Sequence, residues 1–296
     1  MDQATRLREM VGRNRGQEIE NARVIAVTSG KGGVGKTSLS VNIAIQISKM
    51  GKRVVILDAD FGLANVEVML GIRPQYTLLD LIYNGRTIDE IITQGPNGIG
   101  FISGGSGISE LASLDNGSIK LLISELVKLD GMYDVVIIDT GAGITDSVME
   151  FVMVSPEVLL VITPEPTSIT DAYSLLKVLR RKSDFNPLYK TINIISNRVD
   201  NEREGLEIYE KINTVSSKFL NTKLNYYGSV SYDKSVSSAV IAQRPVVEAF
   251  PTSMAAKDIK VLAHKLMHQK RENYKKRDGI AKVFFEFIKS KKRQRT

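Results

Sequence analysis

The residues with the most specific chemistry form a glycine-rich stretch at positions 30–37, Gly-Lys-Gly-Gly-Val-Gly-Lys-Thr. This stretch matches the spacing G-x-x-x-x-G-K-[ST], and it lies between an apolar run and a helical pattern, as a phosphate-binding loop does. Such glycines let backbone N–H groups surround a phosphate at the positive end of the following helix. The pattern predicts nucleotide binding by Gly32, Gly33, Val34, Gly35, Lys36, Thr37 and Ser38, with Lys36 on the β- and γ-phosphates and the Thr37 hydroxyl on Mg²⁺.

Aspartates follow two further runs of β-branched residues. Asp58 and Asp60 end the run at 54–57, and Asp139 ends the run at 135–138. Ligands of open parallel sheets bind at the carboxyl ends of the strands, so these acids favour a site for Mg²⁺ and water, with Asp139 as a metal ligand. For each acid alone, the alternative is a turn or a helix cap.

The elements that position these residues alternate between two kinds of pattern. Runs rich in β-branched and other apolar residues predict buried strands at 24–28, 54–57, 135–138, 158–162 and 191–195. Helical patterns lie between or after them, at 38–50, 118–129, 168–181 and 204–219. The alternation predicts an α/β fold: a doubly wound, mostly parallel sheet with helices on both faces. The glycine- and serine-rich stretch at 102–107 indicates a loop.

Composition excludes several classes of protein. The chain of 296 residues has no cysteine, which excludes disulfides, iron–sulfur clusters and thiol catalysis. Its longest aliphatic run is far shorter than the roughly 20 residues that span a bilayer. The first residues lack the apolar region of a secretory signal, so we expect a cytoplasmic protein. His264 and His268 are spaced i, i+4, but no third metal ligand lies near them, and we expect surface or packing roles.

The net charge of +7 is unevenly distributed. Residues 257–296 hold 14 Lys/Arg and four acids, a net charge of +10, so the other 256 residues carry −3. Within this basic region an apolar helical stripe is made of Ile280, Val283, Phe284, Phe287 and Ile288. A basic amphipathic helix of this kind predicts contact with an anionic membrane surface. The alternatives are a terminal helix docked on the body and, for the charge, nucleic-acid binding, although phosphate binding alone requires no apolar stripe.

Lys31, directly after the first loop glycine, gives the chain a resemblance to the MinD/ParA family of P-loop ATPases with a deviant Walker A motif. The resemblance implies an ATP-dependent sandwich dimer in which Lys31 contacts the partner's nucleotide. It assigns Asp58 to the Mg²⁺ shell and Asp60 to the attacking water. It also assigns adenine to two segments, Asn197-Arg198 and a loop that includes Pro245 and Val246. No N-K-x-D motif follows the strands, which favours ATP over GTP.

The N-terminal Asp2-Gln3-Ala4-Thr5-Arg6-Leu7-Arg8 resembles the D-Q-A-x-x-L-R segment of the FlhG (YlxH) branch of that family, which controls flagellar number and placement. The resemblance implies that Asp2, Gln3, Ala4, Leu7 and Arg8 stimulate the GTPase FlhF. It also implies C-ring proteins of the flagellar basal body as partners and a peripheral location at the inner face of the cell membrane. We therefore expect a partner-activating segment at 1–20, an ATPase domain binding ATP/ADP at 21–274, and a membrane-targeting helix at 275–296.

Two other functions share most of these features. A cell-division site regulator of the MinD type has the same switch and tail but lacks the Asp2–Arg8 motif. A DNA-partitioning ATPase of the ParA type binds duplex DNA with ATP, whereas we expect no sequence-specific nucleic acid.

Overall fold

The structure, a computed structural model, describes residues 21–60, 65–105, 114–182, 185, 190–268 and 279–294. The N-terminal residues expected to activate a partner, Asp2, Gln3, Ala4, Leu7 and Arg8, lie outside the described residues.

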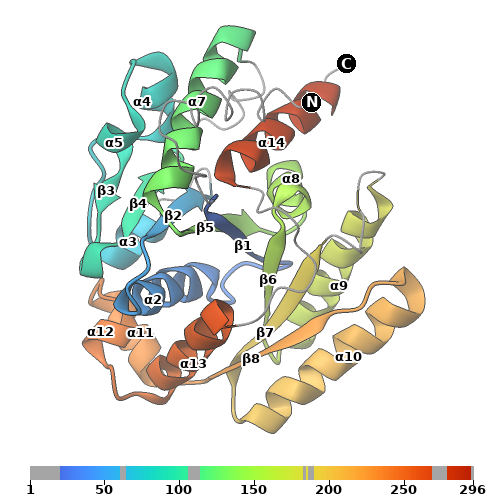
Figure 1. Cartoon of the computed structure of the whole chain (residues 1–296). Coiled ribbons are helices and arrows are strands. Elements are labelled where there is room, and N and C mark those ends of the chain that lie inside the picture. Colours follow the sequence, from blue (N-terminus) through green and yellow to red (C-terminus); the bar gives the residue numbers. More distant parts are fainter. Residues whose placement is uncertain are drawn as a thin grey trace.

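An eight-stranded sheet runs through the described part of the chain in the order β3-β4-β2-β5-β1-β6-β7-β8 (Figure 1). The pairing of β3 with β4 is antiparallel, and the others are parallel. The strands are β1 (Arg23–Ser29), β2 (Val54–Ala59), β3 (Thr93–Gln94), β4 (Gly100–Ser103), β5 (Val135–Ala142), β6 (Glu157–Ile162), β7 (Thr191–Val199) and β8 (Asn225–Ser231). The predicted fold class is confirmed, and all five predicted strands are present. Residues 102 and 103, expected in a loop, belong to β4.

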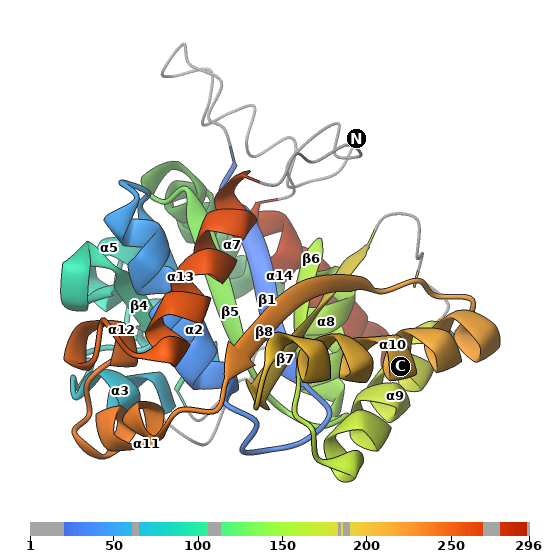
Figure 2. The same ribbon diagram turned by 90° about the horizontal axis from the view of Figure 1, so that it is seen from below.

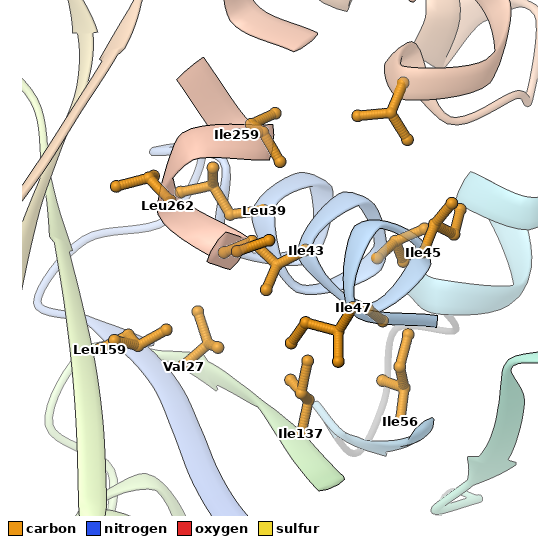
Figure 3. Close-up of a cluster of buried hydrophobic side chains, with 14 of the residues drawn as sticks. Val27, Leu39, Ile43, Ile45, Ile47, Ile56, Ile137, Leu159, Ile259 and Leu262 are labelled. Atoms are coloured by element: carbon orange, nitrogen blue, oxygen red, sulfur yellow. The ribbon is translucent and has the colours of Figure 1, made fainter. Parts of the chain in front are cut away.

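One face of the sheet is covered by helices from both ends of the chain. Ile25 and Val27 of β1 belong to the core on that face. Figure 3 shows Val27 beside apolar side chains of α2 and α13. The helices of this layer are α2 (Lys36–Lys49), α3 (Asn65–Leu70), α11 (Lys234–Ile241), α12 (Val246–Ala249) and α13 (Met254–His268).

The alternate residues of the strands face the opposite layer, as the period of two along a strand requires. Val24 and Ala26 of β1 belong to that second core. The helices there are α4 (Leu78–Tyr83), α5 (Ile88–Ile91), α7 (Asn116–Met132), α8 (Asp146–Val154), α9 (Pro166–Arg181), α10 (Glu202–Leu220) and α14 (Ile280–Gln294), and a 3₁₀ turn, η1 (Pro96–Gly98), precedes β4. Figure 2 shows α13 and α14 on opposite sides of the sheet. The basic region at 257–296 is thus divided between two faces.

The predicted apolar stripe of α14 faces the body of the protein. Ile280, Val283, Phe284, Phe287 and Ile288 are each at most 2% exposed. They pack among side chains of α7 and α8, so the structure has the docked arrangement rather than an apolar stripe open to a membrane. The reason is that Phe151 of α8 offers this stripe an aromatic surface, which the C-terminal sequence alone does not reveal. None of the helices in the described residues is long and apolar enough to cross a membrane.

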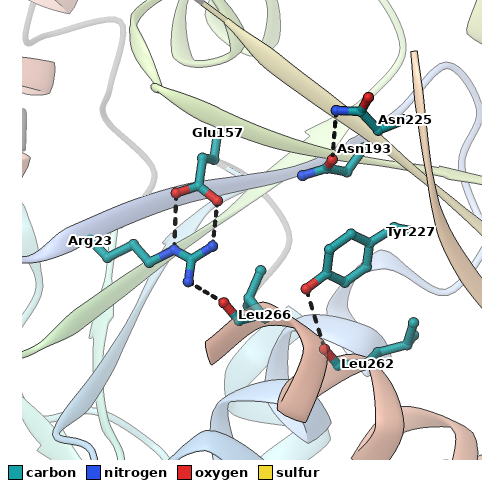
Figure 4. A network of polar contacts seen from close by, with 7 residues as sticks. All are labelled: Arg23, Glu157, Asn193, Asn225, Tyr227, Leu262 and Leu266. Carbon is teal, nitrogen blue, oxygen red and sulfur yellow. Dashed lines mark hydrogen bonds and ion pairs between the residues drawn. The ribbon is translucent and has the colours of Figure 1, made fainter. Parts of the chain in front are cut away.

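A buried polar network fixes α13 to the amino-terminal side of the sheet (Figure 4). Arg23 of β1 donates two hydrogen bonds to Glu157 of β6, at 2.9 and 2.6 Å, and a third to the carbonyl oxygen of Leu266. The Tyr227 hydroxyl donates to the Leu262 carbonyl oxygen at 3.4 Å. A buried charge needs such pairing, and the network therefore resists any movement of α13 away from the sheet.

Candidate functional site

The glycine-rich loop joins β1 to α2, and the chain turns sharply there. Gly35, directly before the first residue of α2, has φ 96° and ψ 22°, a left-handed conformation that favours glycine. A Cβ atom on Gly35 would lie 2.5 Å from Nδ2 of Asn197, so only a glycine fits beside this side chain. Lys36 then begins α2, and the unpaired N–H groups of its first turn suit an anion.

Asp58 of β2 and Asp139 of β5 lie near this loop, as the sequence predicts, although β5 continues past Asp139 to Ala142. Asp58 and Asp139 are register partners on adjacent strands. The Thr37 hydroxyl donates to Asp139 Oδ2 at 2.6 Å, and the Ser40 hydroxyl donates to Oδ1 of the same carboxyl group at 2.7 Å. Two of the three predicted metal residues, Thr37 and Asp139, are therefore in direct contact, and Asp58 belongs to the neighbouring strand.

A second set of hydrogen bonds shapes the loop after β2. The Asp58 carboxylate accepts from the backbone N–H groups of Asp60 (3.0 Å) and Val66 (3.2 Å). The Asn65 side-chain amide donates to Asp60 Oδ2 at 2.7 Å. Asp60 is half-buried, and its second oxygen lies beside Gly141, where a Cβ atom would be 3.0 Å away. These contacts hold the Asp60 carboxylate directly after β2, where it can orient water.

Burial dominates the electrostatics of the carboxylates. It raises the pKa of Asp58 to about 7 and the pKa of Asp139 to about 6. Repulsion from the Asp139 carboxylate raises the pKa of Asp58 as well. Burial also lowers the pKa of Lys36, although Asp139 and Asp60 oppose this shift. Buried carboxylates with raised pKa values mark a place where a further cation is favourable.

The donor set fits Mg²⁺. A hydroxyl and carboxylates are the oxygen ligands that this ion prefers, and it commonly keeps several water and phosphate ligands. Within the described residues, no group of three or more His, Asp or Glu side chains could hold a metal ion alone. Thr37 and Asp139, with Asp58 behind them, are thus suited to share the ion with a nucleotide.

The Lys31 side chain contacts residues of its own chain. Its Nζ donates to Glu165 Oε2 at 2.5 Å and to Thr167 Oγ1 at 2.9 Å, at the start of α9. This ion pair lowers the pKa of Glu165. Both side chains are substantially exposed, so the pair contributes little to stability and is easily exchanged. The expected contact of Lys31 with a partner's nucleotide requires that this pair open.

The first segment expected to contact adenine is Asn197-Arg198, in β7. Asn197 is buried, and its Nδ2 donates to the Val34 carbonyl oxygen at 2.7 Å, so this N–H group supports the phosphate loop. Because the side-chain nitrogen of Asn197 is used in this way, only its side-chain oxygen could pair with an adenine. Arg198 has φ 60° at an irregularity of β7. A positive φ at a residue other than glycine is uncommon, and such residues are concentrated at functional sites.

The second segment expected to contact adenine, which includes Pro245 and Val246, is packed against α2. Pro245 precedes α12, and Val246 is 1% exposed within the core over α2. The neighbouring Val247 N–H donates to the Asn42 side chain of α2 at 3.0 Å. The Val246 side chain is therefore core, and only its backbone remains to contact a base.

Sequence reasoning missed Ser40, Glu165 and Thr167. Ser40 lies three residues after Thr37, on the same face of α2, and this spacing was the available signal. Glu165 and Thr167 lie more than 130 residues from Lys31, and nothing local marks them.

Known proteins resemble this chain in sequence and fold. A family model for the CobQ/CobB/MinD/ParA nucleotide binding domain matches residues 25–246. The antiactivator FleN of Pseudomonas aeruginosa is 42% identical over 244 residues, 82% of this chain and 86% of FleN. The flagellum site-determining protein YlxH of Helicobacter pylori is 31% identical over 247 residues, 82% of this chain and 81% of YlxH.

Solved structures agree on the architecture. The MinD cell division protein of Aquifex aeolicus superposes with a TM-score of 0.65 at 25% identity, over 86% of this chain and all of its own. The septum site-determining protein MinD of Pyrococcus horikoshii, solved with Mg-ADP, gives 0.66 at 23% identity, over 83% of this chain and 96% of its own. The second likeness concerns the fold alone.

Proposed function

Because this chain belongs to the CobQ/CobB/MinD/ParA family of nucleotide-binding proteins, we propose that it is an ATP-driven, dimerising ATPase switch that regulates flagellar number and placement. The hydrogen bond from Thr37 to Asp139, beside the phosphate loop, is the observation that carries the ATPase part. The flagellar part is supported by the names of two relatives, the antiactivator FleN and the flagellum site-determining protein YlxH.

Hydrolysis would use residues that already surround the loop. Lys36 binds the β- and γ-phosphates, and its charge opposes the negative charge that develops during phosphoryl transfer. Asp60, oriented by the Asn65 amide, positions the attacking water. Mg²⁺, when bound near Thr37 and Asp139, neutralises further phosphate charge. Phosphate release from ATP tests this proposal: Asp60→Ala should lose at least about 100-fold in rate while ATP still binds, in the range expected for general-base and positioning groups.

Dimerisation would depend on Lys31. In the ATP state we expect its Nζ to leave Glu165 and to contact the nucleotide of a second copy. The exposed ion pair with Glu165 costs little to break. Lys31→Ala should therefore bind ATP as a monomer, whereas the wild-type chain should dimerise. An ATP dimer of Lys31→Ala as stable as that of the wild type would refute this role.

Membrane association would require that α14 leave its site on the body. A route for nucleotide control runs through α8. Gly141 of β5, just ahead of the loop that leads to α8, lies between Asp60 and Val148, and Phe151 of α8 stacks on α14. The Lys190 ammonium group donates to the carbonyl oxygens of Met153 (2.5 Å) and Ser155 (2.8 Å), which fixes the carboxyl end of α8. A nucleotide-driven movement of the loop would thus act on α14, which would then bind anionic lipid at the inner face of the membrane.

Co-sedimentation with phosphatidylglycerol vesicles tests the release of α14. The wild-type chain should sediment with ATP and remain in the supernatant with ADP. A chain that ends at residue 279 should not sediment with either nucleotide. Equal sedimentation with ATP and ADP would exclude nucleotide control of the membrane state.

Partner activation is the remaining part of the proposal. Residues 1–20 would form the activating segment, 21–274 the ATPase domain and 275–296 the membrane helix. Gln3 would act on the FlhF GTPase, and C-ring proteins would bind the dimer. A peptide of residues 1–20 should accelerate GTP hydrolysis by FlhF, and its Gln3→Ala variant should not. If neither peptide has an effect, a cell-division regulator of the MinD type becomes the better proposal. ATP-dependent binding of duplex DNA would favour the ParA type instead.

A further inference from the structure

Helix α13 is held to the body along its inner face. Ala255, Ile259 and Leu262 are buried in the core over α2 and β8. Leu262 and Leu266 also accept hydrogen bonds from the buried network of Figure 4. Helix α13 is therefore a rigid support for the side chains on its outer, exposed face.

The outer face of α13 combines apolar and basic side chains in one row. We define it by Met254, Lys257, Val261, His264 and His268, all of which are exposed. Met254 is 62% exposed and Val261 is 65% exposed. The spacing of these residues, 3-4-3-4, is that of the seam along which two helices pack in a coiled coil. Tyr232 (61% exposed) and Phe250 (39% exposed) flank the start of the same helix.

The charge along α13 is positive, because the helix holds three lysines and a single acid, Asp258. Asp258 accepts from the Ser231 N–H at 2.9 Å, and Asp233 accepts from the N–H groups of Ser235 (2.8 Å) and Ala255 (3.3 Å). Lys257 and Lys260 form no ion pair with any side chain in the described part of the protein. A partner that brings carboxylates would therefore find unpaired cations.

We propose that the outer face of α13 docks an acidic amphipathic helix of a partner protein. Apolar side chains of that helix would cover Met254 and Val261, and its flanking Glu or Asp residues would face Lys257 and Lys260. Exposed apolar side chains of this size distinguish the face from a purely phosphate-binding surface. A membrane is less suitable, because the lysine at position 257 interrupts the apolar residues and no wide apolar stripe is present.

The proposal does not depend on nucleotide, on α14 or on a flagellar role. Its site lies on the side of the sheet opposite to α14 (Figure 2), so a failure of the membrane or ATPase proposals would leave it unaffected.

A synthetic helical peptide with leucines at its seam positions and glutamates beside them is the probe. Its binding to the full chain is measured by fluorescence anisotropy at low and high salt. We expect a dissociation constant in the micromolar range, weakened roughly tenfold or more in the double variant Lys257→Glu/Val261→Glu. Salt should also weaken binding, because surface charges are screened.

Lys211→Glu on α10 is the matched control, since it reverses another exposed lysine on the other face of the sheet. Thermal unfolding checks that both variants are folded. The proposal is overturned if the peptide does not bind, or if Lys257→Glu/Val261→Glu binds it as the wild type does. It is also overturned if this variant loses affinity for phosphatidylglycerol vesicles or duplex DNA but not for the peptide.

Discussion

The ring of Phe151 stacks on the ring of Phe287, with centroids 4.2 Å apart and ring planes at 20°. The two residues belong to α8 and α14, and α8 begins four residues after β5 ends. The strand that carries Asp139 is therefore joined, through one loop and one short helix, to the docking site of the C-terminal helix. This contact connects the nucleotide site with the part of the chain proposed to bind membrane.

Removing the ring at position 287 should weaken the docking of α14. Phe287→Ala deletes a fully buried aromatic side chain, which typically costs about 3–5 kcal/mol. Thermal unfolding should show a drop of roughly 6 °C or more for a chain of this size. Phe285→Ala is the control, because Phe285 lies at the half-buried margin of the same helix. If the two variants melt at the same temperature, the stacked contact does not hold α14.

Asp130 of α7 should hold the first turn of α14. Its carboxylate accepts from the N–H groups of Ile280 (2.8 Å) and Ala281 (3.4 Å). Asp130→Ala removes this cap, and caps typically contribute about 0.5–2 kcal/mol. Amide hydrogen exchange at residues 280–284 should accelerate by roughly 2- to 30-fold.

Asp115→Ala provides the comparison for Asp130→Ala. Asp115 caps α7 through the Ser118 N–H at 2.8 Å and should leave exchange in α14 unchanged. Faster exchange in α14 with both variants would mean that α7 as a whole, rather than the Asp130 cap, supports the helix.

The carboxylates of the nucleotide site should make stability depend on pH. Burial raises the pKa of Asp58 to about 7, above the value of about 3.9 for an unfolded aspartate. The folded state therefore holds this proton more tightly, and the free energy of unfolding falls as pH rises from about 4 to about 7. Asp58→Asn removes the effect, so in EDTA it should raise the melting temperature at pH 8 by at least about 2 °C and change it little at pH 4.

The exposed Asp89 supplies the control for that measurement. Asp89→Asn should melt like the wild type at both pH values. If Asp58→Asn is destabilised at pH 8, the ionised carboxylate stabilises the fold, and the pKa of Asp58 is not raised by burial.

Asn197 should support the phosphate loop rather than recognise the base by its N–H group. Asn197→Asp keeps the shape but places a carboxylate against the Val34 carbonyl oxygen, which now lies 2.7 Å from the amide nitrogen. Affinity for a fluorescent ATP analogue should fall by roughly 10- to 100-fold, as for a lost hydrogen bond and an unpaired buried group. Asn225→Asp at the far end of β8 also loses an amide donor, and it should bind the analogue normally. Equal loss of affinity for ATP and GTP analogues is expected, because the loop contacts phosphates and not the base.

The sequence was sufficient to predict the central strands and to place the glycine-rich loop beside the acids of β2 and β5. Strands β1, β2, β5, β6 and β7 are buried on both faces and are rich in apolar residues, and the loop and acids lie at or near their carboxyl ends. The edge strand β8 has no such run: its sequence is Asn-Tyr-Tyr-Gly-Ser-Val-Ser, and only Tyr227 and Val230 in it are buried. Lys265 of α13 donates to the Tyr227 carbonyl oxygen of this strand at 2.6 Å, a contact that no local pattern predicts.

The C-terminal helix shows a different limit. An apolar stripe on a helix has the same pattern whether lipid or protein covers it. Its partners here, Phe151 and Asp130, lie more than 100 residues away in the sequence, so only the fold decides which surface the stripe meets. The same holds for Asn197, which the sequence placed after a strand ending at residue 195. It lies within β7, and its partner Val34 was not predicted.

The central claim is that ATP brings two copies of this chain together, and the mass of Asp60→Ala in solution tests it most directly. Light scattering on this variant with ATP and Mg²⁺ should give a stable dimer, because ATP is bound but not hydrolysed. With ADP the variant should be a monomer, and Lys36→Ala should be a monomer with either nucleotide. A monomer of Asp60→Ala at saturating ATP would contradict the account.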